Sequence, residues 1–276
     1  MKHLLRLKDF TKEDILKIFS IADEIEAGGY RDYLKGKSVL LFFPETSIRT
    51  RVTFEKGIQL LGGQSILFSP ETLEKKESLN DVMGYLNNWA DMMVVRHKDI
   101  KKVEELSETA KVPVINAMTS DHHPCEILSD MYALSKIRED FTKDKYLFVG
   151  LNQNIGNTWK DASDLMGFEL SQCCAYGYEI EGITNYYNIE EAVQGKDIVC
   201  TDSLPEKIVR YFHNCHVTKA VMDMANPGAV LNPCPPFYRG EEVSEDAIDS
   251  EHFVGYEFKK HLLTVQQAIM IYCMEN

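Results

Sequence analysis

The segment PETSIRTR, residues 44–51, concentrates hydrogen-bond donors and positive charge. Ser47, Arg49 and Thr50 come soon after the apolar run SVLLFF, and a helical pattern of apolar residues follows them. A loop that leaves a parallel strand and begins a helix offers free backbone N–H groups and the positive helix end to an anion. Hydroxyl groups and a guanidinium complete such a cage. The segment favours a small phosphate site, although a helix cap by Ser47 or Thr46 with solvated arginines would explain the same residues.

Short apolar runs alternate with helical patterns along the chain. The runs that we expect to form strands are residues 38–43, 65–69, 91–96, 112–117, 145–150, 169–176, 197–202 and 229–232. Between them, apolar residues recur at helical spacing, as at Phe54, Ile58 and Leu61. This alternation predicts an α/β fold with mainly parallel sheets flanked by helices. The polar segment SKIREDFTKDK, residues 135–145, divides the strands into two sets and marks a domain boundary.

Length and charge restrict the class of protein. A chain of 276 residues, 44% of them hydrophobic, can bury a substantial core and form one large or two ordinary domains. The formal net charge of -13 disfavours nucleic acid or an anionic membrane as a partner, because the average field of the protein would repel both. The positive charge at Arg49 and Arg51 is therefore expected to serve one small anion.

The N-terminal stretch and the thiols indicate a cytoplasmic protein. Charge interrupts the N-terminal residues every few positions, and no run approaches the about 18 apolar residues of a membrane span. Seven cysteines, an odd number spread over a long chain, do not make the pattern of a disulfide framework. None has the spacing of a zinc site, so we expect no metal.

Several short segments occur in an order and spacing typical of one enzyme family. They are SIRTR (47–51), KKESLND (75–81), VVRH (94–97), HPCEILSDM (123–131), NIGNT (154–158), RGEEV (239–243) and LLTVQQAI (262–269). On these segments, which cover nearly the whole chain, the sequence resembles the aspartate/ornithine carbamoyltransferase family, most closely its ornithine branch. The resemblance implies two α/β domains joined by two interdomain helices. A carbamoyl-phosphate domain, residues 1–137, would be completed by the C-terminal helix 259–276, and residues 138–258 would bind an amino acid.

The resemblance assigns carbamoyl phosphate to residues near the ends of the first strands. Those that would hold its phosphate group are Ser47, Ile48 through its N–H, Arg49 and Thr50. Arg51 matches a family position that is more structural than ligand-binding. No metal or cofactor is implied, because positioning and electrostatics would carry the reaction.

Three further residues are expected around the carbamoyl group. Arg96 and His123 match the residues that, with Thr50, surround the carbonyl oxygen, where negative charge grows as an amine attacks. An isolated histidine would more often be a core residue, but His123 precedes a proline at a helix start, as the family's histidine does. The glutamine of the family's H-P-x-Q motif is Glu126 here. It can still accept a hydrogen bond from the carbamoyl NH2 group, but its charge near a phosphate is costly unless paired.

The amine is assigned to residues of the second half. Asn157 in NIGNT matches the asparagine that ornithine-type enzymes use on the α-amino-acid end. Asp202 matches the ornithine-type aspartate, a suitable counter-charge for an ammonium group. Cys234 falls where the ornithine branch has the cysteine of its H-C-L-P loop, although a lone cysteine is often only a small buried thiol.

The departures from the family pattern affect the amine more than the donor. Pro233 and Pro235 replace the histidine and leucine of H-C-L-P, and DSLPEKI, residues 202–208, stands where the family has S-M-G after its aspartate. The late Asn-Arg pair appears as Lys260 and His261, which places His261 among the expected donor-site residues. Transfer to a different amine or amino acid therefore stays an alternative to ornithine.

Assembly is the last implication of the resemblance. Lys75 and Lys76 lie in a polar loop where the simplest interpretation is a solvated pair. In the family, the matching loop reaches the active site of a neighbouring subunit, so both lysines are candidates for the phosphate and a homotrimer with shared sites is expected. A non-catalytic protein that binds a phosphorylated metabolite is the remaining alternative. Dinucleotide binding is excluded, since VGLNQNIGN lacks the G-x-G-x-x-G spacing.

Overall fold

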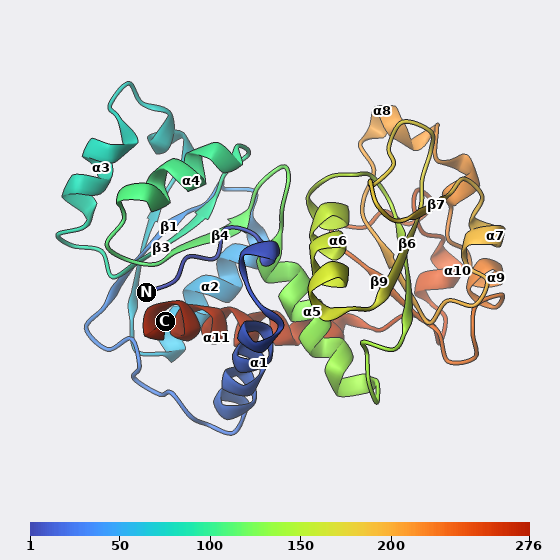
Figure 1. The fold of residues 1–276 in the computed structure, drawn as a ribbon, viewed down its shortest axis with the longest axis horizontal. Helices are drawn as coiled ribbons and strands as arrows, with labels where there is room; N and C mark the ends of the chain where they lie inside the picture. Colours follow the sequence, from blue (N-terminus) through green and yellow to red (C-terminus); the bar gives the residue numbers. More distant parts are fainter. The chain divides into compact units, whose positions relative to one another are not determined.

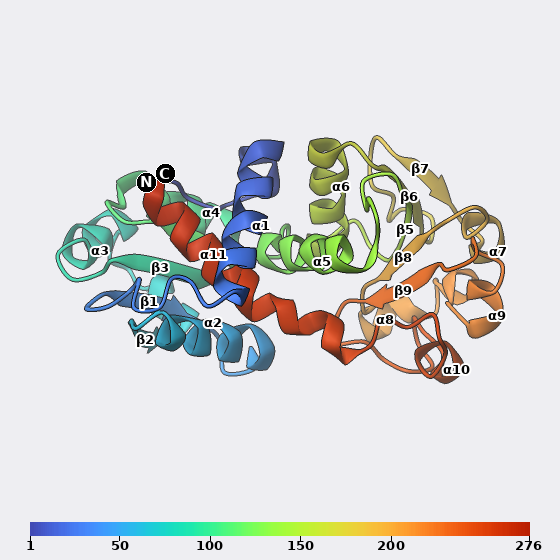
Figure 2. The ribbon, with the colours of Figure 1, turned by 90° about the horizontal axis from the view of Figure 1, so that it is seen from below.

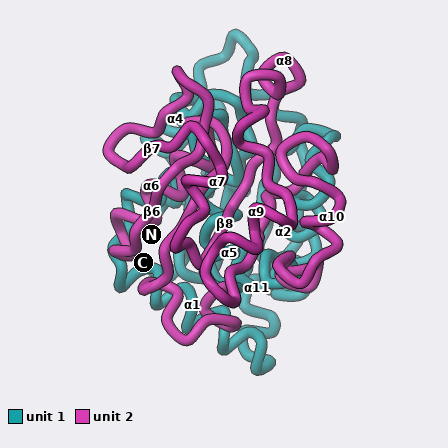
Figure 3. Tube along the Cα trace, turned by 90° about the vertical axis from the view of Figure 1, so that its right-hand side faces the viewer, with its two compact units in different colours: residues 1–133, 259–276 teal, residues 134–258 magenta.

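The computed structural model describes all 276 residues, which form two compact units. One unit comprises residues 1–133 and 259–276, and the other comprises residues 134–258 (Figure 3). The chain leaves the first unit within one helix and returns to it at Lys259, just before the C-terminal helix. None of the helices has the length and hydropathy of a membrane-spanning segment.

The first unit contains a four-stranded, fully parallel sheet in the order β2-β1-β3-β4. Its strands are β1 (Ser38–Phe42), β2 (Gln64–Phe68), β3 (Met92–Arg96) and β4 (Val114–Met118). Its helices are α1 (Lys12–Glu26), α2 (Ile48–Leu60), α3 (Leu79–Leu86), α4 (Ile100–Thr109), most of α5 (Pro124–Ile137) and α11 (His261–Glu275), with short turns η1 (Leu7–Asp9) and η2 (Pro70–Glu74). The helices α3 and α4 lie on one face of this sheet and α2 lies on the other (Figure 2).

The second unit contains a five-stranded parallel sheet in the order β7-β6-β5-β8-β9. Its strands are β5 (Lys145–Val149), β6 (Glu169–Cys173), β7 (Thr184–Tyr186), β8 (Ile198–Thr201) and β9 (Val230–Pro233). Its helices are α6 (Asn154–Met166), α7 (Ile189–Ala192), α8 (Glu206–Val209), α9 (Lys219–Met222) and α10 (Glu245–Ile248), with turns η3 (His213–Cys215) and η4 (Tyr256–Lys260), the latter ending in the first unit. The helix α6 covers one face, and α9 and α10 cover the other (Figure 1).

The predicted α/β architecture with two mainly parallel sheets is confirmed. All eight expected strands form, and the longest of them, residues 169–176, ends as a strand at Cys173. The strand β7 was not expected, because its three residues, TNY, contain no apolar run. Parallel neighbours need a crossover connection, and the helices between the strands supply it.

Side chains on alternate sides of the strands build the cores. In β5, Leu147 and Val149 join the core beneath α7, α9 and α10. Tyr146 points the other way, toward Trp159 of α6, with ring centroids 5.6 Å apart. A Cβ on Gly156 would lie 2.6 Å from a ring carbon of Phe148, so only glycine lets α6 approach the sheet this closely. The start of α6 is thereby fixed next to the end of β5.

The C-terminal helix is part of the first unit. It packs along α1 and α2 (Figure 2). A Cβ on Gly57 of α2 would lie 3.1 Å from Cγ of Gln267, whose amide nitrogen donates to the Gly57 carbonyl at 3.0 Å. Close packing without a side chain at residue 57 therefore fixes α11, and with it the segment that leads into the helix.

Candidate active site

The first sheet reverses its strand order between β1 and β3. The chain passes from β1 to β2 on one side and then to β3 on the other. In open α/β sheets, ligands bind outside the carboxyl ends of the strands at such a reversal. Ser47 lies in the loop after β1, and Arg96 is the last residue of β3. The topology therefore places both residues at the point where a ligand is expected.

Ser47 and Arg96 are in direct contact. Nη1 of Arg96 donates to Oγ of Ser47 at 2.8 Å, and Ser47 is buried. Ser47 occupies the N-cap position of α2, but its side chain makes no capping hydrogen bond. The simpler interpretation of the segment, a side-chain cap by Ser47, is therefore wrong. The serine instead ties the start of α2 to the end of β3.

The first turn of α2 presents its donors in different ways. The N–H of Ile48 donates to the carbonyl of Thr46 at 3.0 Å, while the N–H groups of Arg49 and Thr50 have no acceptor within the protein, as is usual in a first helical turn. Arg49 is exposed and Thr50 is buried. Arg51 is held by Glu55, with Nε 2.7 Å from Oε1. Of the two arginines, Arg49 is the one left available to an anion.

His123 lies immediately before α5 and is buried. Burial lowers the pKa of its imidazole to about 4, with Arg96 and Lys259 acting in the same direction and the charge of Glu126 opposing them. The ring is therefore neutral near pH 7 and offers one N–H donor. A neutral donor in a buried place is suited to an oxygen on which negative charge develops.

Glu126 is buried in the first turn of α5 and is paired with a residue that the sequence did not indicate. Nζ of Lys259 lies 2.9 Å from Oε1 of Glu126 and 2.6 Å from Oδ1 of Asp130. Burial alone would raise the pKa of Glu126, but the charge of Lys259, with smaller effects of the nearby His123, of the hydrogen bond from Lys259 and of Arg49, brings that pKa below its usual value. The available signal was the spacing of Glu126 and Asp130, four positions apart on a helix whose other residues are mostly apolar, since two such carboxylates need a cation.

The remaining expected donor residues lie apart from this cluster of contacts. Nδ1 of His261 is 2.9 Å from Oε1 of Glu26, and the ring packs edge-on against Tyr132 with centroids 5.3 Å apart. Those contacts attach His261 to α1 and α5 rather than to Ser47. Lys75 and Lys76 follow η2, are exposed and have no partner within the chain.

A cavity of about 590 Å³ opens beside Arg96 in the first unit. It is lined by Pro44 from the loop after β1, by Glu71 and Glu74 of η2, and by Thr119 after β4. Its walls therefore come from the carboxyl ends of β1, β3 and β4, the same edge that carries Ser47.

The second sheet has its own reversal of strand order, between β5 and β8. Asn157 lies in the first turn of α6, which follows β5, and Asp202 directly follows β8. Cys234 follows β9, and its N–H donates to the carbonyl of Thr201 at 2.9 Å. The three residues expected to bind the amine are therefore brought to one edge of one sheet.

The surroundings of Asn157, Asp202 and Cys234 differ from those of the residues at the first reversal. Oδ1 of Asp202 accepts a hydrogen bond from the N–H of Ser203 at 2.9 Å. The loop after Cys234 folds over Glu242, a buried carboxyl that accepts from the N–H of Tyr238 at 2.7 Å and whose pKa is raised by burial. The sequence reasoning did not single out Glu242 as the organiser of this loop. The edge therefore offers acceptors and negative charge rather than cations.

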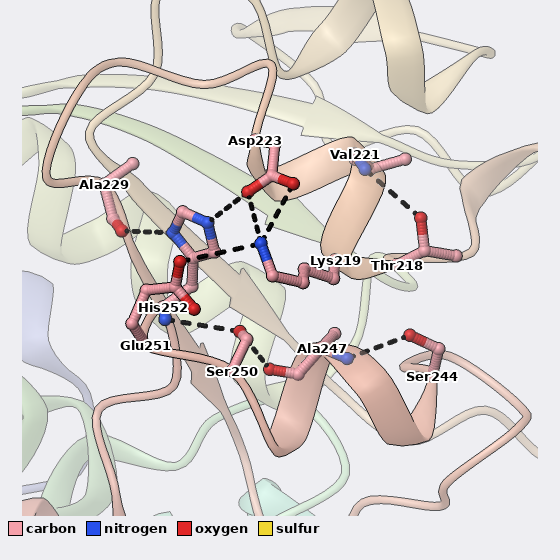
Figure 4. Close-up of polar contacts among 10 residues, drawn as sticks. All are labelled: Thr218, Lys219, Val221, Asp223, Ala229, Ser244, Ala247, Ser250, Glu251 and His252. Carbon is pink, nitrogen blue, oxygen red and sulfur yellow. Dashed lines mark hydrogen bonds and ion pairs between the residues drawn. The ribbon is translucent and has the colours of Figure 1, made fainter.

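One further cluster in the second unit has the composition of a metal site. Asp223, Glu251 and His252 bring ligand atoms within 4.8 Å of one another (Figure 4). Nζ of Lys219 lies among them, 2.9 Å from Asp223 and 3.6 Å from Glu251, and His252 lies 3.0 Å from Asp223. Hydrogen bonds from Lys219 and then His252 lower the pKa of Asp223. The cation at this place is the ammonium of Lys219, so the cluster is an ion-pair network.

The chain is similar to known proteins in both sequence and structure. Residues 2–136 match the family description "Aspartate/ornithine carbamoyltransferase, carbamoyl-P binding domain", and residues 143–273 match "Aspartate/ornithine carbamoyltransferase, Asp/Orn binding domain". The chain is 31% identical to an ornithine carbamoyltransferase of Pelobacter propionicus, over 98% of this chain and 97% of that one. It is 33% identical to that of Desulfotalea psychrophila, over 97% of each. The solved ornithine carbamoyltransferase of Pyrococcus furiosus superposes with a TM-score of 0.93 at 27% identity, covering 100% of this chain and 97% of that one.

Proposed function

This chain belongs to the aspartate/ornithine carbamoyltransferase family and is a carbamoyltransferase that uses carbamoyl phosphate, and from this premise we propose that it carbamoylates the side-chain amine of ornithine. The products are citrulline and phosphate. The full-length relatives named ornithine carbamoyltransferase support this choice over other amines.

The observation that carries the proposal is the contact between Arg96 and Ser47 at the first strand reversal. It links the helix start that carries Arg49 and the N–H groups of residues 49 and 50 to the strand end that carries a second guanidinium. An anion there meets backbone donors, the positive end of α2 and one or two arginines. We assign this place to the phosphate group of carbamoyl phosphate.

The reaction uses the neighbouring donors. The uncharged side-chain amine attacks the carbonyl carbon, the bond between that carbon and the phosphate oxygen breaks, and the leaving phosphate takes the proton. Arg96, Thr50 and neutral His123 donate to the carbonyl oxygen as its negative charge grows, which stabilises the transition state more than the ground state. Holding the reactants in one orientation supplies the rest of the acceleration.

Recognition of the amino acid is assigned to the second edge. The carboxylate of Asp202 is the counter-charge for the ammonium group, Asn157 binds the α-amino-acid end, and Cys234 lies next to Asp202 through the pairing of β8 with β9. These roles are proposals, supported by the common edge on which the three residues lie.

A second candidate is transfer to a different amine or amino acid. The segment after Asp202, SLPEKI, passes through Pro205 at the N-cap of the short helix α8, and Cys234 lies between Pro233 and Pro235. Prolines fix φ and remove backbone donors, so both loops that flank Asp202 have a restricted shape. In this second candidate, these two restricted loops select an amine of another length or charge than ornithine.

A panel of amines separates the two candidates. The purified protein is incubated with carbamoyl phosphate and ornithine, N-acetylornithine, lysine, putrescine or aspartate in turn, and both phosphate and the ureido product are measured. The proposal predicts that ornithine gives the highest kcat/KM. Robust turnover with another amine and none with ornithine would establish the second candidate.

We also propose a homotrimer with shared active sites. The edge strand β2 is exposed along most of its length, including Ile66 and Leu67, and Ile48 and Val52 are exposed on the adjoining helix α2. An apolar sheet edge that no part of its own chain covers favours a partner of the same kind. Lys75 and Lys76, exposed in the following loop, are then available to the site of a neighbour.

A mixing experiment tests the shared sites. Arg49→Ala chains and chains with Lys75 and Lys76 both changed to alanine are each expected to be inactive. After dissociation and reassembly together they should regain part of the activity, because some sites receive intact residues from both chains. A fully active monomer, or no recovery from demonstrably mixed trimers, would contradict the proposal.

A reducing cytoplasm is the setting that we propose for the protein. All seven cysteines are buried as free thiols, and burial raises the pKa of the Cys174 and Cys273 thiols to about 12. Such thiols are poorly reactive, and no disulfide links any two of them.

A further inference from the structure

Two carboxylates of α5 share one ammonium group. Glu126 and Asp130 are four positions apart and therefore on one face of the helix, and Nζ of Lys259 lies 2.9 Å from the first and 2.6 Å from the second. The side chains of Glu126 and Asp130 are 7% and 2% exposed, and that of Lys259 is 20% exposed. Lys259 enters the contact from the turn η4, 133 positions along the chain from Glu126.

Such a group of buried charges has a large desolvation penalty. It is tolerated only when every charge has a partner, and removing one member leaves an uncompensated charge in a poorly solvated place. The charged or titratable groups that act on Glu126 are Lys259, His123 and Arg49, and Asp130 competes for the same ammonium. With His123 neutral, Lys259 is the cation in hydrogen-bond contact with Glu126.

We propose that Lys259 is a positioning residue for the donor substrate, which keeps Glu126 ionised and oriented as a pure hydrogen-bond acceptor for the amino group of the carbamoyl donor. This inference rests on the proposed function, in which the donor binds beside Arg96 and His123. An ionised carboxylate has only acceptors, whereas a protonated one carries an O–H donor. The carbamoyl NH2 group has two donors, so it satisfies the ionised form.

The same pair gives the site a means of rejecting other acyl phosphates. Acetyl phosphate has the phosphate and carbonyl groups of the donor, but a methyl group replaces NH2. Lys259 donates to Oε1 of Glu126, so the binding of acetyl phosphate would leave the other carboxylate oxygen, Oε2, buried against a methyl group without a donor. An unsatisfied buried acceptor is penalised. Selection for carbamoyl over acetyl phosphate is therefore the property that Glu126 and Lys259 confer together.

The sign of the pH effect follows from the charges. Burial raises the pKa of Glu126, yet that pKa lies below its usual value. The Lys259 ammonium is the largest of the effects that lower it. Without Lys259, burial is opposed less strongly and the pKa of Glu126 rises, so Glu126 protonates at a higher pH than in the wild type. Binding that needs the ionised carboxylate is then lost at a higher pH than in the wild type.

The test compares Lys259→Met, Glu126→Gln and the double variant. Affinities for carbamoyl and acetyl phosphate are measured by calorimetry between pH 5 and 8, and Lys17→Met, an exposed position on α1, is the matched control. For Lys259→Met we expect the affinity for carbamoyl phosphate at pH 7 to fall by about ten-fold or more. The loss of that affinity as the pH falls, here called the acid limb, should begin at a higher pH than in the wild type. In the double variant this loss of affinity at acid pH should be absent, since no titrating group is left at position 126.

Glu126→Gln keeps the shape of the side chain. It tests the proposed role of Glu126 in donor selection even if Lys259→Met does not fold. Its preference for carbamoyl over acetyl phosphate should fall by about ten-fold, because the charged acceptor is gone. An unchanged preference in Glu126→Gln, or a Lys259→Met protein with the wild-type acid limb, would overturn the inference. The Arg49→Ala variant separates this from the proposed function. Unchanged binding there would refute the phosphate assignment, whereas lost binding there with wild-type behaviour of both other variants would refute only the role of Lys259.

Discussion

The two sheets reverse their strand order in the same way but present opposite chemistry at the reversal. Between β1 and β3 the chain places Arg49, Arg96 and the start of α2, all suited to an anion. Between β5 and β8 it places Asp202 and the amide of Asn157, with Cys234 on the next strand, all suited to an ammonium group or to a polar amino acid. The topology thus determines where ligands bind, and the side chains determine which ligands.

The departures from the family pattern are also unequally distributed. At the first reversal the motif SIRTR, Arg96 and His123 are intact. Glu126 replaces the family's glutamine and is paired with Lys259, and Lys260 and His261 stand where the family has an Asn-Arg pair. At the second reversal both loops beside Asp202 differ, and no comparable compensation follows. We therefore expect donor binding to be ordinary and any novelty to lie in the choice of amine.

The largest effect is expected at the first reversal. Changing Arg49 to alanine should lower turnover by at least tens-fold, because each lost charge-assisted hydrogen bond is worth about 1.5–3 kcal/mol. Phosphate release measures it. Arg51→Ala is the control, since Arg51 pairs with Glu55 on a partly exposed surface, and a pair of that kind contributes only about 0–1 kcal/mol. Equal losses in the two variants would remove the distinction on which the anion site depends.

Protonation of His123 should give the next largest effect. The folded pKa of about 4 lies below the ordinary 6.5, so the unfolded chain binds the extra proton first as the pH falls from about 6.5 to 4. Stability is therefore lost over that window, by an amount on the order of 3 kcal/mol.

Urea unfolding at several pH values measures this loss. The variant His123→Asn should show a flatter dependence on pH than the wild type, while His213→Asn, at an exposed position, should not differ from it. If the two variants show the same pH dependence, His123 is not buried in its neutral form.

The second reversal should affect the amine alone. Replacing Asp202 with asparagine removes the counter-charge, and the KM for the amine should rise by about ten-fold or more, as expected for a hydrogen bond to a charged group worth about 1.5–3 kcal/mol. Affinity for carbamoyl phosphate measured without amine should stay at the wild-type value. A loss of donor affinity in Asp202→Asn would mean that the two edges do not act separately.

The smallest effect is expected at Cys234. Its sulfur lies 4.0 Å from the carbonyl oxygen of Pro235, at the limit of a weak sulfur contact. Cys234→Ala should raise the KM for the amine only a few-fold, consistent with about 1 kcal/mol or less for a thiol contact. Steady-state kinetics with Cys234→Ser as the companion variant would show the effect, and a hundred-fold loss in both would assign the thiol a direct role.

The sequence was informative where a pattern is local. Buried strands of four or five apolar residues could be found from their composition. Because Ser47 follows one of them, it could be placed in the loop between a strand and a helix. The strand β7 could not be found this way, because its residues, TNY, carry no apolar signal and pair only through their backbone with β6.

Contacts between segments that are distant along the chain could not be predicted from the sequence. Lys259 was overlooked in favour of its neighbours, since nothing local distinguishes it from Lys260, and only the folded chain brings it to Glu126. The hydroxyl of Ser47 likewise had two equally good local interpretations. The choice between a helix cap and a partner for Arg96 depends on where β3 ends, 49 positions along the chain.

The measurement that tests the account most directly is a calorimetric titration of carbamoyl phosphate, without any amine, into the wild type, Arg49→Ala and Asp202→Asn. We predict saturable binding to the wild type, the same affinity in Asp202→Asn, and a loss of at least tens-fold in Arg49→Ala. A folded wild type that does not bind carbamoyl phosphate would contradict this prediction and favour a regulatory protein, and an Arg49→Ala protein that binds as the wild type does would contradict it as well.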